Sequence, residues 1–98
     1  MNDLTFETIS EERAMQYERT LMELYGLVVG GKELWHLLGY KTGDAFRQAV
    51  KRNTLPVPTF VLKGRRARMA RVRDIAEWLA SVDQTAEGYQ PGVQGIVK

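Results

Sequence analysis

Cysteine is absent from this 98-residue chain, and the residue patterns that mark common catalytic and metal sites are missing as well. Without cysteine, neither a disulfide framework nor a thiolate metal site can form. The single histidine, His36, stands between Trp35 and Leu37, where a surface or half-buried side chain is commoner than a ligand. No nucleophile elbow and no histidine–carboxylate constellation is present. We therefore predict that the protein is not an enzyme and uses no metal or cofactor.

Long apolar runs are absent too. No run approaches the length of about 18 residues that a membrane-spanning helix needs. The opening sequence MNDLTFETISEE is acidic and lacks the apolar core of a signal peptide. We therefore expect a cytoplasmic protein with no membrane partner.

Acidic residues are almost missing from the middle of the chain. Residues 41–73 contain ten basic residues and one acidic residue, Asp44, which is a net charge of +9. Since the whole chain carries +2, the remaining residues sum to −7. A segment with so large a net positive charge indicates a polyanionic partner. The alternative interpretation is a basic surface that is only solvated. The ten basic residues are Lys41, Arg47, Lys51, Arg52, Lys63, Arg65, Arg66, Arg68, Arg71 and Arg73.

Apolar residues recur at helical spacing in the N-terminal part. We predict a helix over residues 10–25, with Ser10 as its N-cap and Gly26 at its end. Residues 1–9 show no period and are expected to fray. Residues 27–29, LVV, form a short extended piece.

Two further helices are predicted in close succession. The segment KELWHLLG, residues 32–39, has leucines at helical spacing. After two more residues, Thr42 can cap a helix that ends at Arg52, with Asp44 in its first turn as a partner of the helix dipole. Asn53 follows where a left-handed residue is expected, because asparagine tolerates that conformation. The result is a helix, a short turn and a helix.

A β-hairpin and a last helix follow. Residues 59–62 and 68–72 have strand composition, and Lys63-Gly64-Arg65 supplies the turn between them. Asp74 begins the last helix. We expect three apolar residues to hold the hairpin against the helices: Val61, Met69 and Val72.

This order of elements predicts a mainly α fold with a small β-hairpin, namely a winged helix-turn-helix with an extra N-terminal helix. We divide the chain into an acidic helix or arm over residues 1–26, a DNA-binding domain over residues 27–81 and a flexible tail over residues 82–98. The helix over residues 42–52 would enter the major groove of a duplex, and the basic hairpin would be the wing.

The segments LWHLLGY, DAFRQAVKRNTLPV and VLKGRRARMARVRDIAEWL together resemble the excisionase-like branch of the MerR-type winged helix-turn-helix proteins of mobile elements. The resemblance covers residues 27–80. LMELYGLVV and LPVPTF are also similar, more loosely, to the pyocin-activator group of small regulators. Trp35 stands where the family usually has a small residue, and Asn53 replaces its usual glycine.

This resemblance implies sequence-specific binding to double-stranded DNA, in the nucleoid, by homo-oligomers that bend the duplex. An excisionase, or recombination directionality factor, would position an integrase. A transcriptional regulator would recruit or block RNA polymerase. The sequence leaves these two roles open.

Twelve residues are candidates for DNA contacts. Arg47 and Gln48 could read bases or only touch phosphate, and Lys41 and Thr42 could hold a phosphate, cap the helix or do both. Arg71 and Arg73 could instead turn towards Asp74 or Glu77. Trp35 and Trp78 are expected in the core. The candidate contacts are Lys41, Thr42, Arg47, Gln48, Lys51, Arg52, Lys63, Gly64, Arg65, Arg66, Arg68 and Arg71.

Two other functions compete with DNA binding. The basic block could dock on an acidic protein, which would make the chain an interaction adaptor. It could also bind RNA, but RNA readers bring aromatic residues to stack on bases. The block contains only Phe46 and Phe60, and both are expected to be buried.

Overall fold

The computed structural model describes residues 2–85, with side chains for residues 10–82. This part of the chain is mainly helical, as the sequence predicted, and carries a small three-stranded antiparallel sheet where a two-stranded hairpin was expected. The elements are α1 (Asn2–Tyr25), β1 (Val28–Gly30), α2 (Gly31–Leu37), α3 (Gly43–Arg52), β2 (Phe60–Val61), β3 (Arg68–Arg71) and α4 (Val72–Thr85).

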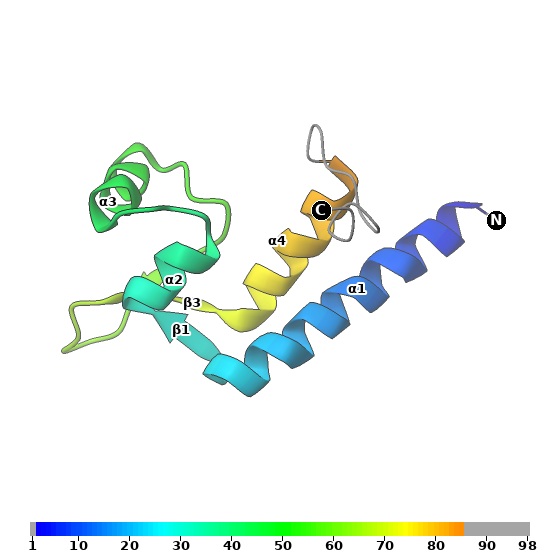
Figure 1. Ribbon diagram of the computed structural model, residues 1–98, viewed down its shortest axis with the longest axis horizontal. Helices are drawn as coiled ribbons and strands as arrows, with labels where there is room; N and C mark the ends of the chain where they lie inside the picture. The colour runs from blue at the N-terminus through cyan, green and yellow to red at the C-terminus, as the bar shows by residue number, and fades with distance from the viewer. Residues whose placement is uncertain (1, 86–98) are drawn as a thin grey trace, which may run out of the picture.

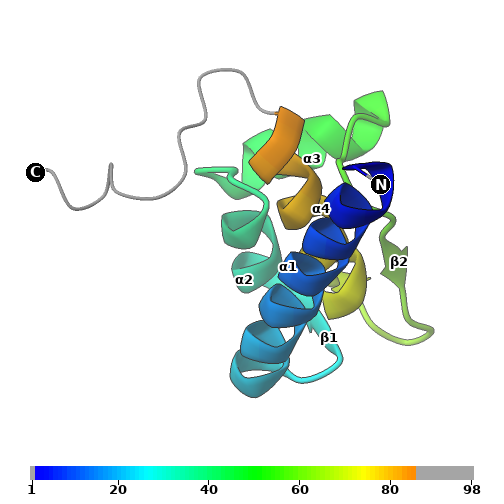
Figure 2. The ribbon, with the colours of Figure 1, turned by 90° about the vertical axis from the view of Figure 1, so that its right-hand side faces the viewer.

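The two long helices, α1 and α4, pack side by side (Figures 1 and 2). Leu21 of α1 and Ile75 of α4 are buried in the same apolar cluster. The helix α1 begins at Asn2, eight residues before the start that the sequence predicted. The helix α4 continues to Thr85 and so includes residues 82–85, which were assigned to the tail. The rest of the expected tail, residues 86–98, lies outside the described residues.

The sheet has the strand order β1-β3-β2, so β3 lies between its two neighbours. β1 was expected only as an extended piece, yet it pairs antiparallel with β3 and places Val29 opposite Ala70. Both residues are buried, and Leu34 of α2 packs in the same cluster. The strand β1 thus links α1 to α2 and, through its pairing with β3, joins the two long helices to the part of the molecule that contains α3.

The helix α3 confirms its predicted bounds and both of its ends. The hydroxyl oxygen of Thr42 accepts a hydrogen bond from the backbone N–H of Ala45 at 3.0 Å. Asn53 closes the helix in the left-handed conformation, with φ 59° and ψ 43°. Phe46 and Ala49 face the core and are buried, which leaves the polar residues of α3 on the outer face.

The hairpin corrects one predicted anchor. Val61 is 47% exposed, whereas Val72 is buried as expected and Met69 is half-buried. The residue of β3 that enters the core is Ala70, not Met69. Val61 pairs with Arg68 and therefore lies on the same face of the sheet as Ala70, but beyond the part of that face that the core buries.

Candidate nucleic-acid interface

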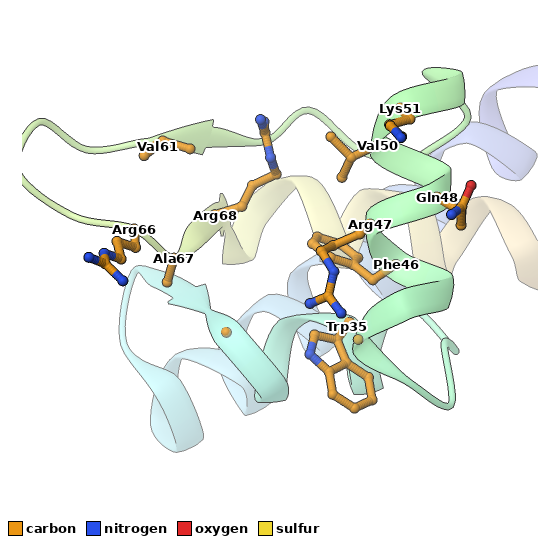
Figure 3. A pocket seen from close by; sticks show the side chains of 12 residues that line it. Trp35, Phe46, Arg47, Gln48, Val50, Lys51, Val61, Arg66, Ala67 and Arg68 are labelled. Atoms are coloured by element: carbon orange, nitrogen blue, oxygen red, sulfur yellow. The ribbon is translucent and has the colours of Figure 1, made fainter.

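A groove of about 570 Å³ separates α3 from the β2–β3 hairpin (Figure 3). The two elements on either side of it, α3 and the hairpin, lie at the end of the molecule that is farthest from the start of α1 (Figure 1). Its lining combines basic, apolar and amide side chains: Trp35, Phe46, Arg47, Gln48, Val50, Lys51, Val61, Arg66, Ala67 and Arg68, together with Gly31 and Gly43. Four of these residues are basic and none is acidic, so the groove has a strongly positive lining.

The helix α3 contributes Arg47, Gln48 and Lys51, and all three are exposed. Their placement follows from the helical period, because Phe46 and Ala49 occupy the buried side. The three residues of α3 that the sequence marked as candidate contacts in this groove are therefore on its exposed side.

The hairpin contributes Val61 and Arg68 from two paired strands. The register places Val61 opposite Arg68, and Arg68 is two residues from the buried Ala70. Directly opposed residues, and residues two apart on a strand, share a face of the sheet. The face that α2 covers at Ala70 therefore continues beyond α2 and looks across the groove at α3.

Arg68 is fixed in place by its neighbours. The side chain is half-buried, and its Nη1 donates a hydrogen bond to the hydroxyl oxygen of Thr59 at 2.9 Å. A guanidinium that is already ordered loses less side-chain entropy when it grips an anion. Arg68 is thus the most preorganised cation of the groove.

Trp35 was expected in the core, but it is half-buried and lines the groove from α2. Figure 3 shows the guanidinium of Arg47 beside its indole. Gly43 makes room for both, since a Cβ there would lie 3.3 Å from Nη1 of Arg47 and 3.8 Å from the Trp35 ring. The sequence did contain a signal that Trp35 lies away from the core. Leu34, one residue earlier, lies on the core face of α2, so Trp35 is rotated by about 100° away from it.

Arg47 forms an ion pair with Asp44, which lies one turn earlier on α3. Asp44 therefore occupies the first turn, as predicted, and also neutralises one of the groove cations. Both side chains are largely exposed, so this pair contributes little to stability. Arg47 can exchange Asp44 for another anion at small cost.

The other candidate residues are not brought to the groove. Lys41, Arg52, Lys63 and Arg65 are exposed outside its lining. Thr42 caps α3, as one of its two interpretations predicted, and this role does not exclude phosphate binding.

Gly64 occupies the hairpin turn with φ +81°, where the N–H of Arg65 donates to the carbonyl of Leu62 at 2.9 Å. The turn therefore has the geometry that glycine was expected to supply. It holds Lys63 and Arg65 in solvent at the tip of the hairpin.

Arg71 and Arg73 both turn to carboxylates of their own chain. Arg71 lies on the face of β3 opposite to Arg68, and its Nε donates to Asp74 at 3.0 Å. Arg73 pairs with Glu77 at 3.5 Å. The alternative interpretation of these two arginines is therefore correct, and we leave Arg71 out of the interface.

Other kinds of site find no support in the part of the chain that the structure describes. Within residues 2–85, no three histidine or acidic side chains gather as metal ligands, and no helix has the length and apolar character to span a membrane. Comparison of the chain with protein families, curated proteins and solved structures finds no match.

Proposed function

We propose that the chain is a winged helix-turn-helix protein that binds double-stranded DNA through the groove between α3 and the hairpin. The observation that carries this proposal is the lining of that groove, with four basic residues, no acidic residue and an exposed amide. Positive lining of this kind suits the phosphate backbone, which supplies most of the affinity in protein–DNA complexes.

The arrangement of elements supports the same reading. Two short helices, α2 and α3, are separated by five residues, and a hairpin with a basic turn follows them. In winged helix proteins the second helix reads the major groove and the hairpin reaches phosphates or the adjacent minor groove. The ten residues of α3 span about 15 Å, which fits lengthwise in a major groove about 12 Å wide.

Each groove residue then has a distinct role. Arg47 and Gln48 lie on the exposed face of α3, where Arg can pair with guanine and Gln with adenine. Lys51, Arg66 and Arg68 contact phosphates, and Arg65 extends the contact at the wing tip. Trp35 and Val61 form an apolar floor against which the sugar edge of the backbone can pack.

The biological setting that we propose is a mobile element, and it rests on the sequence resemblance alone. There the protein acts as an excisionase, as a transcriptional regulator or as both. As an excisionase, it has no chemistry of its own, and its binding free energy offsets the cost of bending the duplex, which is on the order of a few kcal/mol.

Fluorescence anisotropy with a labelled duplex tests the proposal. If about six phosphates are neutralised, the affinity should fall about 10³-fold between 50 and 200 mM salt. Combined Lys51→Ala and Arg66→Ala substitutions should weaken binding and flatten the salt dependence. Combined Arg71→Ala and Arg73→Ala substitutions remove the same charge outside the groove and serve as the matched control. A protein that ignores duplex DNA at low salt, but captures acidic proteins, would instead be an adaptor.

Footprinting on the DNA that flanks the protein's own gene separates the two roles. Repeated sites next to an integrase attachment site support excision. Protection of a promoter supports transcriptional regulation.

A further inference from the structure

The side chain of Arg47 lies beside α2 as well as along α3. Side chains of a helix lean towards its N-terminus, so Arg47 lies over Gly43, four residues earlier. Gly43 leaves this place free, because a Cβ there would lie 3.3 Å from Nη1 of Arg47 and 3.8 Å from Cε2 and Cζ2 of Trp35. The guanidinium and the indole therefore lie beside each other over a position that has no side chain (Figure 3).

Trp35 is itself held in place. Its side chain is half-buried and packs against the core cluster, and its ring lies edge-to-face with that of His36, with the centroids 4.4 Å apart. The backbone N–H of Tyr40 donates to the carbonyl oxygen of Trp35 at 2.9 Å, which fixes the backbone at the end of α2. A tryptophan side chain has only two torsions, so a ring with these neighbours is a rigid wall beside Arg47.

The two neighbours of the Arg47 guanidinium differ in what DNA binding would require of them. Asp44 is an anion that pairs with Arg47, so a base or phosphate has to replace it. Trp35 is uncharged and accepts no hydrogen bond, so it does not compete with a ligand of Arg47. The indole can therefore stay beside the guanidinium in the complex and restrict the directions in which its N–H groups point.

We propose that Trp35 is the positioning residue of Arg47, and that it holds the guanidinium for two hydrogen bonds to O6 and N7 of one guanine in the target site. Such a pair of bonds needs a guanidinium whose plane is fixed. The positioning role rests on the proposed DNA binding and adds the residue that makes Arg47 selective. A Trp35 that only packs against a sugar would instead contribute equally to every duplex.

Replacement of guanine by 7-deazaguanine tests this role at a single atom, because the analogue lacks the N7 acceptor and still pairs with cytosine. The preferred duplex is first selected from a random library with the wild-type protein, and each of its guanines is then replaced in turn. One replacement should lower the wild-type affinity about 10-fold. The same replacement should have no effect on Arg47→Ala, and in Trp35→Ala its effect should fall to about 2-fold or less.

Two further variants separate positioning from folding. Trp35→Phe keeps an aromatic side chain against the core and removes the outer edge of the indole, where Cζ2 lies beside Gly43. It should therefore keep the helix content of the wild type by circular dichroism and still reduce the effect of 7-deazaguanine. Val61→Ala is the matched control, since Val61 lines the same groove from the hairpin, away from Arg47 (Figure 3). The effect of 7-deazaguanine should stay the same in that variant.

The outcomes distinguish this role from DNA binding itself. Trp35 variants that bind every duplex more weakly, while 7-deazaguanine still costs about 10-fold, would overturn the positioning role and leave DNA binding intact. A wild-type protein that binds duplexes but depends on no guanine N7 would do the same. A protein that binds no duplex at low salt would overturn both.

Discussion

Arg47 and Asp44 form an ion pair along α3, and Arg47 lines the groove together with three other basic residues. The guanidinium of Arg47 is thus paired with a carboxylate of its own helix, and under the proposed function a DNA phosphate or base would replace that carboxylate. The pair is exposed, with 70% of the Arg47 side chain and 85% of the Asp44 side chain accessible to water. Because such pairs contribute only about 0–1 kcal/mol, Asp44 should lower the affinity of Arg47 for another anion without preventing that contact.

The first prediction follows from this pair. Asp44→Asn removes the competing carboxylate and should raise the affinity for duplexes of unrelated sequence about 3- to 10-fold. The difference in affinity between the best DNA site and a random sequence should become smaller, because Arg47 without its ion-pair partner can bind any phosphate. Anisotropy titrations at several salt concentrations measure both effects, and the salt slope should steepen by about 1. Glu77→Gln makes the same charge change beside Arg73, away from the groove, and should alter affinity much less. Equal effects of the two substitutions would refute a special role for Asp44.

The second prediction concerns the division of work between helix and wing. Arg47→Ala should relax the sequence preference, because a base contact is worth about 1–3 kcal/mol of discrimination. Combined Arg65→Ala and Arg66→Ala substitutions should weaken all duplexes alike and lower the salt slope by about 2. Selection from a random-sequence library measures the preference, and titration measures the affinity. If helix and wing variants change preference and affinity in the same proportion, the assigned roles are wrong.

The third prediction concerns two glycines with different surroundings. A Cβ at Gly30 would lie 2.9 Å from Cγ of Met69 and 3.0 Å from the carbonyl oxygen of Arg68. Gly30→Ala should therefore lower the free energy of unfolding by about 1–3 kcal/mol, since β1 and β3 must move apart. Urea denaturation, followed by circular dichroism, measures this loss.

Gly43→Ala is the matched control for this crowding. Its Cβ would lie 3.3 Å from the flexible end of Arg47 and in ordinary van der Waals contact with the Trp35 ring, at 3.8 Å, within a helix that favours alanine over glycine. The free energy of unfolding should stay the same or rise by up to about 1 kcal/mol. A Gly43 variant as unstable as the Gly30 variant would show that the sheet is not the source of the effect.

Local signals in the sequence were sufficient for α3. Thr42 can cap, Asn53 can turn left-handed, and the apolar residues between them repeat at the helical period, so neighbouring residues alone determine the two ends. The same reasoning placed Arg47, Gln48 and Lys51 on the outer face. These three residues line the groove because that face is the one left free of the core.

Other features depended on partners that are distant in the sequence. The pairing of Val29 with Ala70 joins segments about forty residues apart, and three residues of LVV carry no mark of it. Val61 is exposed because it lies beyond the buried part of the sheet face that it shares with Ala70, and the extent of that burial depends on elements distant in the sequence. The place of Trp35 depends on how α2 and α3 meet at Gly43. The pattern of residues along a single sequence contains none of these relationships between distant segments.

The side-by-side packing of α1 and α4 has a practical consequence. The helix α1 extends beyond α4, so the start of α1 lies at the opposite end of the molecule from α3 and the hairpin (Figure 1). A fluorophore or an affinity handle attached ahead of Asn2 would stand clear of the cationic lining. Protein immobilised on a sensor chip through that point would present the groove outward, towards whatever flows past it.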